Sequence, residues 1–173
     1  MKEYFAHYGF NESYSVAKSL SARADSDSPD SPNRLAAFVF IAFTYESALN
    51  HLGELVFKSW KDYFERLSPE AKLTLLTDKS GLKPDFTKPP FQSFVATIKI
   101  RNSLAHHKVE FLEVSEDQLK SPDLWPKPKW KNQMRSMSAG KALSDLDEVV
   151  QILENALGVW LPSRFIIMEQ VQK

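Results

Sequence analysis

Apolar residues recur at helical spacing along most of this chain, and no segment shows the sustained alternation of apolar and polar residues that marks an amphipathic strand. No internal repeat is visible. The pattern therefore predicts an all-α protein, most simply an antiparallel up-and-down bundle of four to six helices. Residues 1–173 are expected to form a single domain, because this length fits one hydrophobic core.

Start and stop signals place the expected helices along the chain. In chain order they are residues 2–23, residues 33–60, a short helix opened by Ser68-Pro69-Glu70 and closed by Gly81, a helix from Phe91, and a last helix from Ser144 that Pro162 kinks or breaks before residues 163–171. Ser31 and Ser68 are suitable N-caps, because each precedes a proline at the first helical position. Ser144-Asp145-Leu146-Asp147 resembles a capping box.

The domain is expected to have four parts. An N-terminal helix and a polar, proline-containing linker occupy residues 1–30, and the core helices occupy residues 31–109. Residues 110–143 contain three prolines and predict a long irregular excursion, which is unusual unless it serves a function. The C-terminal helix is expected within residues 144–173.

Composition argues against several classes of function. None of the five glycines lies in a GxGxxG or P-loop pattern, and the absence of cysteine excludes disulfides, thiolate metal sites and cysteine nucleophiles. No HExxH or comparable ligand spacing is present, so neither a metal nor a cofactor is expected. The N-terminus lacks the apolar run of a signal peptide, and the apolar run Leu35–Phe43 is too short to span a bilayer. A cytoplasmic protein without a membrane partner is the expectation.

Charge is balanced overall but not locally. The chain has 22 basic and 22 acidic residues, so no global field attracts nucleic acid. Residues 124–144 contain basic side chains and two tryptophans but no acidic residue. Such a segment suits a phosphate backbone and stacked bases, and it equally suits a solvated loop whose tryptophans pack on the bundle. The candidate RNA-binding residues are Lys127, Lys129, Trp130, Lys131 and Arg135.

The most distinctive chemistry lies in the stretch RNSLAH, residues 101–106, near the end of an otherwise apolar helix. On a helical projection one face carries Phe91, Phe94, Val95, Ile98, Ala105 and Val109. Asn102 falls in the middle of this face, between Arg101 and His106. His107 projects to nearly the opposite side, beside Ile100, so His106 is the expected functional histidine.

The trio Arg101, Asn102 and His106 has two interpretations. Buried amide, guanidinium and imidazole groups cost free energy unless each finds a partner, so such a trio is either a satisfied internal network or a functional site. In the structural alternative, Arg101 pairs with a carboxylate on another helix, for which Glu46 is the candidate. The histidines and Lys108 then place positive charge at a helix C-terminus.

Arg101, followed by a polar Asn102 and then by His106, resembles the R-x(4-6)-H motif of the HEPN superfamily. The whole of residues 88–108, KPPFQSFVATIKIRNSLAHHK, looks like the apolar helix that leads into RNxxAH in that superfamily. Residues 67–72, LSPEAK, are similar to a short helix of some members. His107 also satisfies the spacing, and the segment 110–143 departs from a minimal bundle.

The resemblance implies an up-and-down bundle, a homodimer that brings two motifs together, and often metal-independent endoribonuclease activity in defence or toxin–antitoxin systems. Its implied partners are RNA, a second copy of the chain, and an antitoxin or nucleotidyltransferase-like protein. The implied catalytic residues are Arg101, Asn102 and His106. Glu46, His107 and Lys108 are candidate supporting residues, the first as the expected partner of Arg101 and the other two because they follow His106 in the chain. Other members are noncatalytic modules that bind a nucleotide, an RNA or a protein, and a purely structural helical dimer is a third alternative.

The residues suit RNA cleavage without a metal. A histidine side chain titrates near neutral pH, so it can take a proton from a ribose 2′-hydroxyl or give one to the leaving oxygen. Arg101 would stabilise the charge that develops on the phosphate through its bidentate fork. Asn102 would orient the imidazole or hold the phosphate. A dimer would supply two histidines, one as acid and one as base.

Overall fold

A computed structural model of the chain describes residues 9–106, 109–121 and 125–161. Within these ranges it contains eight helical segments and no strand, so the predicted all-α class is confirmed. The segments are α1 (Gly9–Ala24), α2 (Pro32–Val56), the π-helical turn η1 (Trp60–Phe64), α3 (Pro69–Ser80), α4 (Phe91–Ala105), α5 (Glu116–Leu119), α6 (Lys129–Ser136) and α7 (Ala139–Leu157).

Two predicted helix starts and one predicted stop are confirmed. The Ser31 hydroxyl accepts a hydrogen bond from the main-chain N–H of Arg34, and the Ser68 hydroxyl accepts one from that of Ala71. Each of these helices has proline in its first turn, where no main-chain donor is needed. Gly81 ends α3 in the left-handed conformation, with φ at 73°.

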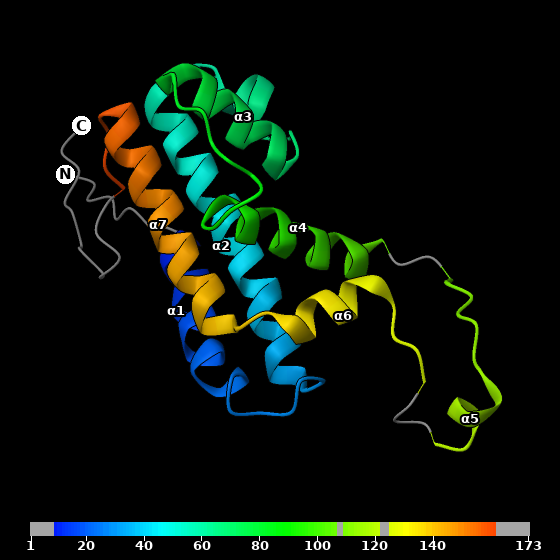
Figure 1. Cartoon of the computed structure of the whole chain (residues 1–173). Coiled ribbons are helices and arrows are strands. Elements are labelled where there is room, and N and C mark those ends of the chain that lie inside the picture. Colours follow the sequence, from blue (N-terminus) through cyan, green and yellow to red (C-terminus); the bar gives the residue numbers. More distant parts are fainter. Residues whose placement is uncertain (1–8, 107–108, 122–124, 162–173) are drawn as a thin grey trace.

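The long helix α2 lies at the centre of the fold and contacts α1, α3, α4 and α7. The helices α1 and α2 form an antiparallel hairpin, and α7 packs beside both. Figure 1 shows that α2 and α7 run in the same direction, while α4 extends sideways from the middle of the molecule. The simple up-and-down order is therefore not confirmed.

The core is built around the buried side of α2. Tyr45 of α2 and Phe94 of α4 are fully buried and meet edge to face, with 5.0 Å between ring centroids. Leucines of α3 and α7 complete the apolar cluster. By length and composition alone α2 could cross a bilayer, and half of its apolar window is buried in this fold. The core helix of a soluble protein passes the same test, so this finding does not show the location of the protein. Cytoplasmic location remains a prediction.

The segment predicted to be irregular, 110–143, contains two helices and the start of a third. The short helix α5 lies away from the other helices (Figure 1), but α6 packs against α4. The prediction failed here because Pro128 stands directly before α6, as its N-terminal boundary, rather than interrupting it.

The last helix begins earlier and ends earlier than predicted. Its N-cap is Ser138, whose hydroxyl accepts a hydrogen bond from Lys141, whereas Ser144 lies exposed within the helix. Gly158, at a φ of 67°, ends the helix before Pro162 is reached. The predicted continuation over residues 163–171 lies outside the described residues.

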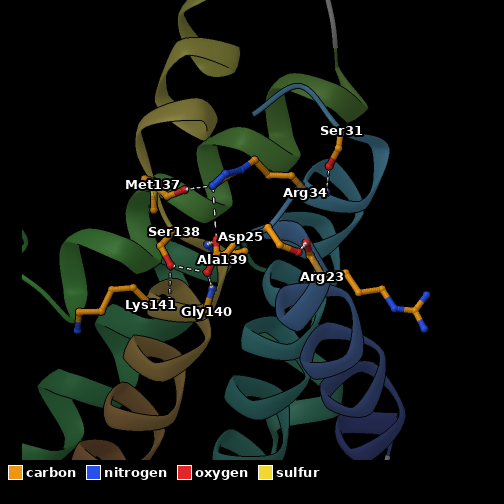
Figure 2. Close-up of polar contacts among 10 residues, drawn as sticks. Arg23, Asp25, Ser31, Arg34, Met137, Ser138, Ala139, Gly140 and Lys141 are labelled. Atoms are coloured by element: carbon orange, nitrogen blue, oxygen red, sulfur yellow. Dashed lines mark hydrogen bonds and ion pairs between the residues drawn. The ribbon is translucent and has the colours of Figure 1, made fainter. Parts of the chain in front are cut away.

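Asp25, just after α1, holds the start of α7 (Figure 2). Its carboxylate accepts hydrogen bonds from the main-chain N–H groups of Ala139 and Gly140 at 2.8 and 2.9 Å, and from the Ser138 hydroxyl at 2.7 Å. Arg34 joins this network by donating to Asp25 and to the carbonyl of Met137. A carboxylate at a helix N-terminus satisfies free donors and complements the helix dipole. The contact fixes the junction between α6 and α7.

A second contact anchors α6 to the loop between α1 and α2. Lys131 and Arg135 each form an ion pair with Asp30, at 3.5 and 3.3 Å. Met134, between them on the helix, is buried in the core. These contacts hold α6 against the body of the protein, beside the end of α4.

Candidate functional site

An open groove of about 700 Å³ lies where the end of α4 meets α6 and the start of α3. Its lining comprises Glu46, Leu67, Ser68, Pro69, Lys99, Arg101, Asn102, Ser103, His106, Lys129, Trp130 and Gln133. The groove thus brings the motif residues Arg101, Asn102 and His106 together with three residues of the basic segment 124–144, which are Lys129, Trp130 and Gln133. The sequence alone gave no indication that these two segments meet.

Arg101 is held by two neighbours. Its Nη2 lies 2.5 Å from the Glu46 carboxylate, and its Nη1 donates a hydrogen bond to the side-chain oxygen of Asn102 at 2.9 Å. The guanidinium also lies 6.0 Å from the centre of the Phe43 ring. These contacts fix the plane of the guanidinium at the groove, while its Nε has no hydrogen-bond partner among the described residues.

Glu46 also binds a second cation, which sequence analysis missed. The Lys72 ammonium lies 3.4 Å from the other carboxylate oxygen of Glu46. The Lys72 side chain is 1% exposed, so this charge is removed from water and needs the carboxylate. The sequence carried no signal for this burial, because a lysine on a short helix is usually exposed.

Asn102 and His106 lie at the end of α4. The Asn102 side-chain oxygen accepts a hydrogen bond from Arg101, and no hydrogen bond joins it to the His106 imidazole among the described residues, so its predicted role, orienting the imidazole or holding the phosphate, stays a prediction. The main-chain N–H of His106 closes the last turn of α4 by donating to the Asn102 carbonyl at 2.9 Å. The side chain of His106 is exposed and lines the groove. His107 and Lys108 lie outside the described residues.

The predicted apolar face of α4 is partly wrong. Phe91, Phe94 and Ile98 are buried as predicted, but Ala105 is exposed, and Val109 follows the helix and is 80% exposed. Ile100, predicted on the opposite side, is completely buried. The reason is that α4 contacts α2, α6 and α7, which together bury a wider arc than a single face. Arg101, Asn102 and His106 consequently line a groove and are not packed inside the core.

The five candidate RNA-binding residues are divided between different surroundings. Lys129 and Trp130 line the groove, whereas Lys131 and Arg135 pair with Asp30. Lys127 is not part of the lining, and its carbonyl accepts a hydrogen bond from Asn132. The groove adds residues that sequence analysis did not select, namely Lys99, Ser103 and Gln133.

In comparisons with protein-family models, curated proteins and solved structures, nothing matches this chain. Among the described residues, no group of three histidine, aspartate or glutamate side chains is placed to hold a metal ion. Function is therefore inferred from the residues that line the groove.

Proposed function

We propose that this chain is a HEPN-like, metal-independent endoribonuclease that acts through Arg101, Asn102 and His106. The observation that carries the proposal is that a fixed guanidinium and an exposed imidazole line one open groove. A guanidinium recognises phosphate, and an imidazole exchanges protons near neutral pH. The groove therefore offers a phosphate-binding group and a proton-exchanging group at one surface.

In the proposed reaction, His106 removes the proton from a ribose 2′-hydroxyl, and the resulting oxygen attacks the adjacent phosphorus. The bond from phosphorus to the 5′-oxygen breaks, and that oxygen takes a proton from a second histidine. The products are a 2′,3′-cyclic phosphate and a free 5′-hydroxyl. Arg101 stabilises the negative charge on the phosphate oxygens, and Asn102 keeps the guanidinium in its plane.

The second histidine is assigned to a second copy of the chain. One groove contributes one described histidine, His106, and a single imidazole cannot be acid and base in the same step. A homodimer with two grooves facing each other would complete the site. The expected result is that specific activity falls on dilution, in step with dissociation measured by analytical ultracentrifugation.

The test of catalysis uses the purified full chain with mixed structured and single-stranded RNA in excess EDTA. We expect cleavage to cyclic phosphate ends by the wild type and by His107→Ala, and none by His106→Ala or Arg101→Ala. DNA of the same sequence should stay intact, because it lacks the 2′-hydroxyl. Unchanged cleavage by His106→Ala, or no cleavage by a folded dimer, would overturn the proposal.

The second candidate is a noncatalytic HEPN-like module that binds a nucleotide, RNA or protein through the same groove. The zero net charge of the chain favours it, because a free-standing ribonuclease gains from a basic field. Overexpression in cells distinguishes the two candidates if the chain is the toxin of a cytoplasmic toxin–antitoxin pair, because an active toxin arrests growth. Growth arrest on overexpression that disappears with Arg101→Ala supports the enzyme, and growth unaffected by the wild type supports the module.

A further inference from the structure

One side of the helix α6 lines the groove, and the other side forms ion pairs with the loop before α2. Lys129, Trp130 and Gln133 line the groove. The helix α6 packs against α4, and Figure 1 shows the two helices side by side. Lys131 and Arg135, four residues apart, pair with Asp30 on the loop before α2. One side of α6 therefore anchors the helix, and the other adds side chains to the groove.

The groove is locally basic in a chain without net charge. Its lining contains three basic side chains, Lys99, Arg101 and Lys129, against one carboxylate, that of Glu46. That carboxylate is shared between Arg101 and the buried Lys72. Lys99 and Lys129 are exposed, and neither forms an ion pair within the part of the chain that the structure describes. These two ammonium groups are available to phosphates.

Trp130 adds an aromatic side chain to the same lining. It is partly buried, packs against the core and borders the groove. Its indole N–H has no hydrogen-bond partner among the described residues. A groove that combines an aromatic ring with basic side chains suits single strands, because a base that is not paired can stack on the ring.

We infer that Lys99, Lys129 and Trp130 form a subsite for single-stranded RNA, in which a base beside the scissile phosphate stacks on Trp130 and flanking phosphates contact the two lysines. The inference rests on the proposed function, because it places RNA in the same groove. It assigns the substrate class as unpaired RNA. The bases of a duplex stack on one another and do not reach the ring.

The experiment measures binding separately from cleavage. A 5′-labelled single-stranded RNA octamer is titrated with the His106→Ala chain, and fluorescence anisotropy gives the Kd at one fixed salt concentration. Lys99→Glu and Lys129→Glu are compared with Lys18→Glu, which makes the same charge change at an exposed position of α1. We expect the two groove variants to bind about tenfold more weakly, and the control to bind like the parent.

A second pair of variants tests the contribution of Trp130 to RNA binding. Trp125 is half exposed and does not line the groove, so Trp125→Ala controls for Trp130→Ala. We expect Trp130→Ala to weaken binding by about tenfold and Trp130→Phe to retain most of it, because a smaller ring still stacks. Circular dichroism checks folding, and the exposed lysine variants keep the test valid if Trp130→Ala unfolds.

Each outcome decides between defined alternatives. The subsite is overturned if the parent does not bind the octamer, if the groove variants bind like Lys18→Glu, or if duplex RNA binds equally well with the same dependence on Lys129. Groove-dependent binding by a wild type that never cleaves RNA would sink the proposed catalysis and keep the subsite. RNA cleavage by Lys99→Glu and Lys129→Glu with an unchanged KM would support the proposed catalysis and overturn the subsite.

Discussion

Glu46 lies 2.5 Å from Arg101 at the groove, and its second carboxylate oxygen lies 3.4 Å from the Lys72 ammonium inside the fold. The three residues come from α2, α3 and α4. One carboxylate therefore neutralises a charge that has no access to water and also orients the arginine assigned to phosphate binding. Stability and the proposed chemistry depend on the same residue.

Removal of Glu46 should therefore destabilise the fold more than removal of Lys72. Glu46→Ala leaves the Lys72 ammonium buried without a carboxylate, which we expect to cost about 3–5 kcal/mol in the free energy of unfolding. Lys72→Met leaves Glu46 paired with Arg101 and should cost much less. Urea denaturation of both single variants and of Glu46→Ala/Lys72→Met tests this. A double variant as unstable as Glu46→Ala would contradict the explanation.

Arg101→Lys should show whether RNA cleavage needs only the positive charge of Arg101 or also the planar geometry of its guanidinium. The substitution keeps a positive charge but loses the fork that binds Glu46 with one nitrogen and Asn102 with another. We expect the RNA cleavage rate to fall by about a hundredfold or more, as when one donor to a developing charge is removed. The rate is measured in single-turnover assays, with thermal unfolding as the control for folding. A rate within a few-fold of the wild type would show that charge alone suffices.

The parts of the fold that were predictable depend on local interactions. The starts of α2 and α3 follow from a serine hydroxyl that binds a main-chain N–H three residues later, and Gly81 ends α3 because glycine adopts a positive φ readily. The motif at Arg101 and its candidate partner Glu46 were also recognisable, because a guanidinium on an apolar helix requires a carboxylate.

The parts that were missed depend on contacts between distant residues. The start of α7 is fixed by Asp25, which lies 114 residues before Ala139 in the chain. The position of α6 depends on ion pairs between its basic side chains and Asp30, 105 residues away in the case of Arg135. These contacts, together with the buried Met134, help to hold α6 against α4 and so to form the groove. The spacing of apolar residues within α6 does not indicate which other helix it will pack against.

A side chain at Gly53 should destabilise the fold, because Trp60 packs directly against this position. A Cβ atom at Gly53 would lie 2.3 Å from the indole ring of Trp60, which is itself completely buried. We expect Gly53→Ala to destabilise the fold by about 1–3 kcal/mol, the usual cost of overpacking a core. Gly9→Ala is the control, since a Cβ there meets nothing within 4 Å. Equal unfolding midpoints for the two variants would contradict the packing.

Asp25 should make stability depend on pH in a defined direction. Burial alone would raise the pKa of its carboxyl, but hydrogen bonds from Ser138, Gly140 and Ala139 and the charge of Arg34 together lower it below its ordinary value. Folding therefore favours the ionised form. This stabilisation is complete above the pKa of the unfolded chain and is lost as the pH falls through the lower pKa of the folded state.

The test compares Asp25→Asn with the wild type by urea denaturation between pH 7 and pH 3. At neutral pH the variant should be less stable by about 1 kcal/mol, the typical loss when a helix N-terminus loses its capping carboxylate. The difference should begin to shrink below about pH 4, where the carboxyl of the unfolded chain starts to bind a proton, and it should be lost as the pH falls through the lower pKa of the folded state. Asp62→Asn, at an exposed position, removes the same charge without touching α7. A difference between Asp25→Asn and the wild type that stays constant down to pH 3 would show that the ionised carboxylate does not hold the start of α7.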